Sequence, residues 1–198
     1  MRVTQGCGHF GHSTEGGTHS LDLYLTEAHV SPVSRTTVSS LLTEFLASAS
    51  VMSKCETCFA DVPHHERGNY PDSESLNHTR MALLEGSRPP PTLFVHVNRV
   101  SFAPDGGSNR IEGRVQADPL TITYYAPYRD GDTDPDGAVV ATATYAPTGV
   151  IDHLAAQGVS TGGHYTTTLL EQDEKWYKFD DASVSMAAPP PALGPAGS

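Results

Sequence analysis

The residue types of proton-transfer chemistry stand in two segments near the end of the chain. His164 follows Gly163 at the start of one strand-like run, and Asp180 and Asp181 close the next such run. If the two runs pair as a hairpin with its turn at residues 171–174, the imidazole and a carboxylate lie at the same end. A carboxylate that orients an imidazole through one ring nitrogen leaves the other nitrogen to act as a base. The alternative is a histidine and an acid on a solvated hairpin.

Cysteine and histidine residues earlier in the chain have the types and spacing of a metal site. Cys55 and Cys58 form a C-x-x-C pair, which lets two thiolates reach one ion from a tight turn. The remaining cysteine is Cys7, which lies two residues before His9. These two residues would complete a closed Cys3His zinc site with the C-x-x-C pair, and His12 is the alternative fourth ligand. An odd number of cysteines argues against a disulfide framework. Ordinary thiols beside solvated histidines remain the alternative.

An acidic loop at residues 132–137 matches the opening of a calcium loop, D-x-D-x-D-G. The bidentate glutamate of such a loop belongs at the position of Ala143, and Pro135 occupies the fourth loop position. A strand pattern also replaces the exiting helix. The sequence therefore favours a solvated acidic loop.

The composition excludes several classes of partner. The chain has 198 residues and a formal net charge of -11 with only 12 Lys and Arg residues, whereas nucleic acids and anionic membranes need clustered positive charge. The start of the chain, MRVTQGCGHFGH, has no apolar leader segment, and no run reaches the ~18 apolar residues of a membrane span. We therefore expect an intracellular protein, in the cytoplasm or nucleus, that binds neither nucleic acid nor membrane.

Hydrophobic spacing predicts a helix early in the chain and strands later. Alternation in LDLYL predicts a strand at Leu21–Leu25, and apolar positions recurring at three and four from Val38 to Ala49 predict an amphipathic helix. The proline-led run Thr92–Phe102 predicts a buried strand. Further strands are expected at residues 110–122, 138–145, 149–155, 163–170 and 175–179, as an antiparallel series, with an exposed loop at 63–75. The order is typical of one α+β domain with a disordered tail at 186–198.

Two motifs around the candidate proton-transfer residues resemble the C-terminal signature of the ubiquitin-specific proteases, the papain-like cysteine deubiquitinases. They are Gly162-Gly163-His164-Tyr165 and the run WYKFDDASV at residues 176–184. In that family the GHY histidine is the general base, and the first aspartate of the FDD run orients it. The resemblance implies these roles for His164 and Asp180, with Asp181 as a neighbour that supports the site.

The resemblance extends upstream through two further strands. Residues 145–153, YAPTGVIDH, are similar to the family's strand before the GHY loop, in which we interpret His153 as a packed or hydrogen-bonded structural residue. Residues 91–102 are similar to a proline-led strand that usually ends in Leu-Lys-Arg-Phe. The chain has VNRV there, at residues 97–100, and so departs from this ending, of which it keeps the arginine as Arg99.

The same family often carries a zinc ion at the tip of its fingers region. Two pairs of ligands hold this ion, and a strand and a helix separate the pairs in the sequence. The present chain has a similar layout, with the predicted strand at 21–25 and the predicted helix from Val38 between the pairs. The resemblance therefore implies a structural Zn2+ held by Cys7, His9, Cys55 and Cys58.

The resemblance implies an α+β fold that is part of a papain-like cysteine protease. It consists of an antiparallel β palm and fingers with few helices, and the thumb is missing. Residues 1–185 correspond to the partial catalytic domain, with a zinc fingers-like region at about 1–90 and the palm at 91–185. The family's nucleophile lies in a box similar to Gly-Asn-Thr-Cys-Tyr that opens a helix, and this chain has no such box. Cys7, among glycines with no helix following, is poorly placed to attack.

We expect a fragment of a cysteine-type deubiquitinase that hydrolyses (iso)peptide bonds after the C-terminal glycine of ubiquitin. Its partner is ubiquitin or a ubiquitinated protein, whose basic face suits an acidic chain. Two alternatives stay open: a catalytically inactive ubiquitin-binding pseudo-protease, and a zinc-stapled structural domain in which both motifs are coincidental. The missing nucleophile is compatible with a truncated gene, a fragment that needs a partner, or a pseudoenzyme.

Overall fold

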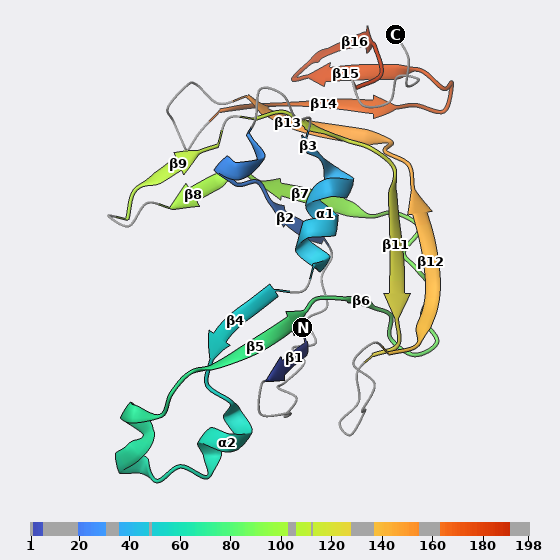
Figure 1. The fold of residues 1–198 in the computed structure, drawn as a ribbon. Helices are drawn as coiled ribbons and strands as arrows, with labels where there is room; N and C mark the ends of the chain where they lie inside the picture. The colour runs from blue at the N-terminus through green and yellow to red at the C-terminus, as the bar shows by residue number, and fades with distance from the viewer. Residues whose placement is uncertain are drawn as a thin grey trace. The chain divides into compact units, whose positions relative to one another are not determined.

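The computed structural model describes residues 2–5, 20–30, 36–47, 49–102, 106–111, 113–127, 137–154 and 163–190. They form strands with a few short helices and belong to two compact units (Figure 1). Unit 1 comprises residues 1–19, 43–91 and 122–143, and unit 2 comprises residues 20–42, 92–121 and 144–198. Among the helices that the structure describes, none has the length and apolar character of a membrane span.

Unit 2 contains a parallel pair of strands, β2 (Ser20–Tyr24) and β7 (Phe94–Asn98). Leu21 and Leu23 of β2 are 3% and 0% exposed, whereas Asp22 and Tyr24 alternate with them and are exposed. This alternation confirms the strand predicted at residues 21–25. A short 3-10 helix, η1 (Glu27–His29), follows β2.

The buried strand predicted over residues 92–102 is interrupted at Arg99. Before it, β7 pairs with β2, and after it, β8 (Val100–Phe102) pairs with β9 (Ser108–Arg110) as an antiparallel hairpin. The side chain of Asn98 accepts a hydrogen bond from Val100 N–H at 2.9 Å, and Arg99 O accepts one from Ile111 N–H at 2.7 Å. A local side-chain bond thus marks the change of partner strand. The burial was also predicted wrongly, because Phe94 is 66% exposed and Val95 and Val97 are only half-buried.

The amphipathic helix is confirmed as α1 (Val38–Leu46), in which Leu41 and Leu42 are buried. Its start is fixed by reciprocal capping, because Ser40 N–H donates to Thr37 Oγ1 and Thr37 N–H donates to Ser40 Oγ, each at 3.1 Å. The predicted extension to Ala49 was wrong. Ala49 begins β4 (Ala49–Ser53), which pairs with β5 (Ser73–His78), so strand pairing overrides the helical spacing there.

The single strand predicted over residues 110–122 is divided into separate pieces. β9 ends at Arg110, β10 (Val115–Gln116) pairs in parallel with β3 (Thr36–Thr37), and β11 (Leu120–Tyr125) begins later. Asp118 lies between β10 and β11 and accepts a hydrogen bond from Ser39 N–H at 2.9 Å, while Ser39 Oγ donates to its other oxygen. Asp118 therefore caps α1 from a distant part of the sequence, which explains why the strand is broken.

Four strands of unit 2 form one antiparallel sheet in chain order (Figure 1). They are β13 (Gly149–Leu154), β14 (His164–Leu170), β15 (Trp176–Asp180) and β16 (Ser183–Ala187). The first three confirm the strands and the antiparallel series predicted there. β16 was not predicted, and the expected tail at 186–198 was wrong at its start, because Met186 and Ala187 pair with Tyr177 and Trp176. β16 forms because it pairs with β15, whereas its serine-rich sequence does not predict a strand.

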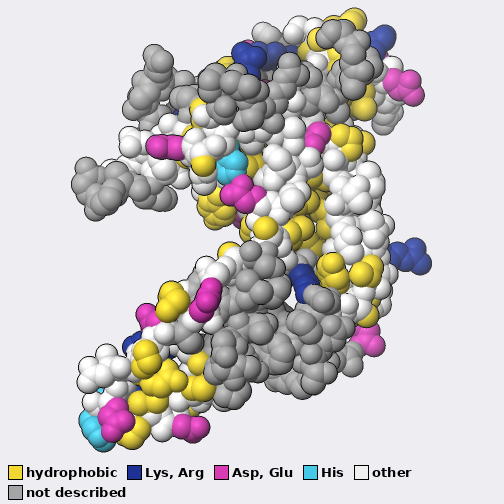
Figure 2. All heavy atoms as spheres, in the orientation of Figure 1, with side chains coloured by type: hydrophobic (Ala, Val, Ile, Leu, Met, Phe, Trp, Pro, Cys, Tyr) yellow, Lys and Arg dark blue, Asp and Glu magenta, His cyan; other side chains and the backbone are white. Residues whose placement is uncertain are grey.

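In unit 1, β1 (Arg2–Gln5), β5 and β4 form an antiparallel sheet, and β4 leads to α2 (Glu56–Ala60). The loop predicted at 63–75 instead contains a 3-10 helix, η2 (His64–Asn69), and the start of β5. Phe59 organises this end: the Tyr70 ring packs on it at 5.7 Å, and Lys54 and Arg67 lie over it at 5.4 and 5.3 Å. Hydrophobic side chains accordingly gather at the surface over α2 (Figure 2).

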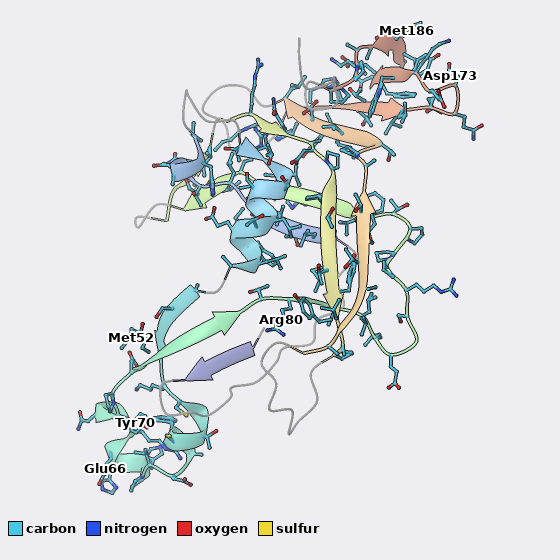
Figure 3. The ribbon with its side chains drawn as sticks, turned by 45° about the vertical axis from the view of Figure 1, so that its right-hand side comes forward. Met52, Glu66, Tyr70, Arg80, Asp173 and Met186 are labelled. Carbon is cyan, nitrogen blue, oxygen red and sulfur yellow. The ribbon has the colours of Figure 1, made fainter. Side chains whose placement is uncertain are left out.

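A further sheet, most of whose residues belong to unit 1, has the order β12, β11, β6, where β6 is Met81–Ala82 and β12 is Val139–Tyr145. β12 confirms the strand predicted at 138–145. Ile122 and Tyr124 of β11 are buried, at 0% and 2% exposure. At the end of β11, the guanidinium of Arg80 lies 4.9 Å from the centre of the Tyr125 ring. Figure 3 labels Arg80.

The parallel pair of unit 2 predicts a sharp contrast between neighbouring residues of β2. Leu23→Ala removes a side chain with no exposure, so we expect the free energy of unfolding to fall by about 2–5 kcal/mol. Tyr24→Ala is the matched control, because Tyr24 is 58% exposed, and we expect a loss below about 1 kcal/mol. Urea unfolding followed by circular dichroism measures both, and equal losses would contradict the burial of Leu23.

Candidate active site

The predicted hairpin brings His164 and Asp180 into contact. His164 is the first residue of β14 and Asp180 is the last residue of β15, and the strands pair with Thr167 opposite Phe179. The turn at residues 171–174 closes the other end of the hairpin. His164 Nε2 lies 2.5 Å from Asp180 Oδ1, a distance typical of a short, charge-assisted hydrogen bond. The geometry expected from the spacing of the two motifs is therefore present.

This contact changes the pKa of both groups. The hydrogen bond is the main cause that raises the pKa of His164 above its ordinary 6.5, and it lowers the pKa of Asp180 below its ordinary 3.8. The negative charge of Asp181 also raises the pKa of His164, whereas the positive charge of Lys178 lowers the pKa of His164. Lys178 Nζ lies 3.8 Å from Asp180 Oδ2. His164 and Asp180 are each 43% exposed, so solvent screens the pair and its contribution to stability is small.

The directions of the two pKa changes define the pH range in which the ion pair is complete. The contribution of protonated His164 is fully present below pH 6.5 and is lost as the pH rises through its raised pKa. The contribution of ionised Asp180 is present above pH 3.8 and is lost as the pH falls through its lowered pKa. The pair is thus complete between pH 3.8 and 6.5, and neutral imidazole, the basic form, becomes dominant only above the raised pKa of His164.

The contact also determines which nitrogen of His164 is left for chemistry. Asp180 engages Nε2, and Nδ1 has no hydrogen-bond partner within the described part of the chain. A carboxylate only accepts, so the Nε2 that faces it carries the proton and Nδ1 of the neutral ring has a lone pair. Nδ1 can therefore take a proton from an acid such as a thiol and later return it.

Asp181 stands beside the pair, after the end of β15, with φ at 50° in the left-handed region. One ligand-type atom from each of His164, Asp180 and Asp181 lies within 4.8 Å of the others. Metal–ligand bonds of about 2.0–2.2 Å hold ligand atoms about 3 Å apart or more. The 2.5 Å hydrogen bond leaves no place for an ion between the imidazole and Asp180, so the arrangement suits proton transfer.

Gly163 precedes His164 in a conformation that favours glycine, with φ at 152°. A Cβ at this position would lie 2.3 Å from His153 Nε2 and 2.9 Å from Leu154 O. Both neighbours belong to β13, the strand beside β14. The glycine therefore allows β13 and the start of β14 to approach closely at the point where the imidazole begins.

His153 was expected to be packed or hydrogen-bonded, and it is both. Its ring stacks on the Tyr165 ring at 4.4 Å with an interplanar angle of 18°. Arg110 NH2 donates to His153 O at 2.8 Å, and Arg110 NH1 lies 3.4 Å from His153 Nδ1. Arg110 was not predicted, because nothing in its local sequence distinguishes it from a surface arginine at the end of a strand.

The C-x-x-C pair lies at the start of α2. Cys55 is the N-cap residue and is 2% exposed, and its Sγ accepts a hydrogen bond from Cys58 N–H at 3.4 Å. A C-x-x-C pair at the start of a helix can direct two sulfur atoms toward one ion. The other predicted ligands, Cys7 and His9, and the alternative His12, lie outside the described residues, as does most of the acidic loop at 132–137.

Comparison with known proteins connects the chain to enzymes that act on ubiquitin. The sequence model of the ubiquitin carboxyl-terminal hydrolase family matches residues 21–192. Ubiquitin carboxyl-terminal hydrolase 8 of Arabidopsis thaliana is 30% identical over 99 residues, which are 49% of this chain and 10% of that protein.

Two solved structures show the likeness in fold. One is the SAGA Ubp8/Sgf11/Sus1/Sgf73 DUB module bound to ubiquitin aldehyde, with a TM-score of 0.62 at 16% identity over 94% of this chain and 36% of that chain. The other is a yeast SAGA DUB module with a mutant Sgf73, with a TM-score of 0.60 at 16% identity over 94% of this chain and 35% of that chain. The present chain thus covers about a third of these solved chains and a tenth of the curated relative.

The contact with Asp180 predicts how the imidazole of His164 titrates. In the unchanged chain, NMR titration of the histidine ring should give His164 a pKa above 6.5. Asp180→Asn removes the negative charge, so the pKa of His164 should fall toward its ordinary value. Asp173→Asn is the matched control, because Asp173 lies at the turn end of the hairpin, where it accepts a bond from Tyr177 (Figure 3). An unchanged pKa of His164 in Asp180→Asn would refute the contact.

Proposed function

Because the chain belongs to the ubiquitin carboxyl-terminal hydrolase family and shares the fold of the ubiquitin-specific proteases, we propose that it forms the base-bearing part of a cysteine-type deubiquitinase. The substrate is an (iso)peptide bond after the C-terminal glycine of ubiquitin. The observation that carries the proposal is the 2.5 Å contact between His164 Nε2 and Asp180 Oδ1. That contact supports the assignment of His164 as an oriented base where the two family motifs meet.

In the proposed reaction, Nδ1 of His164 takes the proton of a cysteine thiol as its sulfur attacks the carbonyl carbon of the ubiquitin glycine. The carbon–nitrogen bond breaks, the imidazolium gives its proton to the leaving amine, and a thioester remains. Water then hydrolyses the thioester, with His164 again as the base. Asp180 holds the Nε2–H tautomer and stabilises the imidazolium, and Asp181 adds negative charge beside it.

We assign the attacking thiol to a segment outside this chain. Cys55 is 2% exposed and caps α2 with its sulfur, which suits a structural role. The sequence around Cys7 lacks the helix start that lowers the pKa of a nucleophilic thiol. The chain covers about a third of the length of the solved relatives. A protein of their length would have room for a separate segment that carries the nucleophile.

Ubiquitin is the proposed partner for two reasons. A structure similar to this chain is that of a module bound to ubiquitin aldehyde. The net charge of -11 also suits a partner with a basic face and an arginine-bearing tail. The same observations support the second candidate, a ubiquitin-binding pseudo-protease without turnover. A zinc-stapled structural domain, the third candidate, requires neither ubiquitin binding nor His164.

We also propose a structural zinc ion at the start of α2. Cys55 and Cys58 fit a soft cation, because both offer sulfur and a backbone N–H already points at Cys55 Sγ. Cys7 and His9, with His12 as the alternative, complete the proposed ligand set. The ion would fix the end of unit 1 that Phe59 organises, where few side chains are buried.

Titration of the whole chain into 15N-labelled ubiquitin tests the proposed partner. We expect specific chemical-shift changes on ubiquitin and no hydrolysis of a ubiquitin C-terminal fluorogenic substrate by the chain alone. Adding the cysteine-bearing segment of a relative in trans should restore turnover. His164→Ala should then reduce the rate by at least about 1,000-fold without weakening ubiquitin binding, because only the proton transfer is lost.

The Asp173→Asn variant is the control for turnover, because its side chain lies at the far end of the hairpin (Figure 3). Turnover that persists in His164→Ala would overturn the assigned base. Ubiquitin binding without turnover in any reconstituted mixture would favour the pseudo-protease. If the chain shows no ubiquitin binding and no turnover, the structural domain is favoured.

The zinc proposal predicts about one zinc ion per purified chain by elemental analysis. Cys55→Ser and Cys58→Ser should each reduce the zinc content to near zero and lower the thermal midpoint, because the ligand set is broken. Thr57→Ala is the matched control, since Thr57 is exposed between the two cysteines and should keep the metal. Full zinc content in Cys55→Ser would contradict the assignment.

A further inference from the structure

Arg110 connects two parts of unit 2 that are separate in the sequence. It ends β9, and its guanidinium reaches β13, where NH2 donates to His153 O at 2.8 Å and NH1 lies 3.4 Å from His153 Nδ1. β13 has only β14 as a neighbour among the described strands, so Arg110 binds at the edge of the sheet. Figure 1 shows β9 on the same side of unit 2 as the start of β14.

The chemistry of Arg110 determines the state of the His153 ring. A guanidinium only donates hydrogen bonds, so a nitrogen that faces it must accept. Nδ1 of His153 is therefore the unprotonated nitrogen, and the ring proton is on Nε2. Because one arginine meets both the carbonyl and the ring of His153, it fixes the backbone and the side chain of that residue together.

The ring of His153 in turn contacts the two chain neighbours of His164. It stacks on Tyr165 at 4.4 Å, and its Nε2 lies so close to Gly163 that a Cβ there would be 2.3 Å away. Tyr165 is also the cross-strand partner of His153, while His164 is the partner of Leu154. The residues before and after the imidazole are thus held by one aromatic ring.

The stack with Tyr165 does not bury a core side chain. Tyr165 is 63% exposed, whereas the buried side chains of this sheet include Thr166 and Trp176, at 3% and 8% exposure. Residues of β14 alternate between faces, so Tyr165 lies on the face opposite His164 and Thr166. The contact therefore restrains the strand locally rather than adding to the packed face of the sheet.

We propose that Arg110 and His153 are positioning residues, which fix the backbone on both sides of His164 and so set its imidazole against Asp180. They act through Gly163 and Tyr165, and the chain of contacts runs from β9 to β13 to the start of β14. The inference rests on the proposed function in one respect, namely that His164 is the base of the reaction.

The test observes the His164–Asp180 contact directly in the full chain, with neither ubiquitin nor a nucleophile present. Long-range 1H–15N spectra of the histidine rings report the proton on Nε2 and the pKa of His164. In Arg110→Ala and His153→Ala, we expect the Nε2–H signal to broaden or disappear and the pKa to fall toward its ordinary value. Arg110→Lys keeps the charge but not the fork of donors, and should give a smaller change in the same direction.

His153→Phe tests rescue by a conservative substitution. Phenylalanine keeps a ring that can stack on Tyr165 and cover Gly163, but it cannot accept from Arg110 NH1. We therefore expect it to retain most of the His164 signal that His153→Ala loses. Leu169→Ala is the matched control at the other end of β14, where the Leu169 side chain covers Gly149. It should lower the thermal midpoint and leave the titration of His164 unchanged.

An unchanged Nε2–H signal and pKa of His164 in folded Arg110→Ala and His153→Ala would overturn the proposal and leave these residues a purely structural role. If an alanine variant is unfolded by circular dichroism, Arg110→Lys and His153→Phe decide the question, because unaltered His164 signals in both would equally refute it. Failure of turnover or ubiquitin binding would refute the proposed function alone, since the spectra depend on neither.

Discussion

The register of the β14–β15 hairpin is the constraint on which the candidate site depends. Thr167 pairs with Phe179, and this pairing lets His164 reach Asp180 on one face of the sheet. Because side chains alternate between faces, a slip of one residue would place the two groups on opposite faces. Trp176 lies on the same face as Asp180 and is 8% exposed, so a slip would also expose the large indole. Burial of Trp176 and alignment of the site are therefore one requirement.

The site combines a restrained backbone with an exposed ion pair. His164 and Asp180 are each 43% exposed, so their attraction in water is too weak to hold the imidazole alone. The close approach of His153 to Gly163 supplies a steric restraint that solvent does not screen. Strand pairing and packing therefore set the position of the imidazole, and the hydrogen bond to Asp180 sets the tautomer of His164 and raises its pKa.

An imidazole and a carboxylate move a proton, but a papain-like reaction also needs a sulfur that forms the covalent bond. The proposed function makes the chain one part of a larger reaction centre, which is compatible with its partial coverage of the solved relatives. The net charge of -11 and the open Nδ1 of His164 are compatible with this proposal. The proposed function assigns recognition and proton transfer to the residues of this chain.

The sequence by itself determined the short-range features of this protein. Alternation placed β2, the capping residues placed α1, and the spacing of the two motifs placed His164 and Asp180 at the same end of a hairpin. Tertiary structure decided where the run after residue 92 changes partner, where α1 ends and that β16 forms. It also decided that Arg110 meets His153 and that Asp118 caps α1. Local patterns report the preferences of neighbouring residues, whereas these contacts join distant segments whose approach depends on the packing of the whole unit.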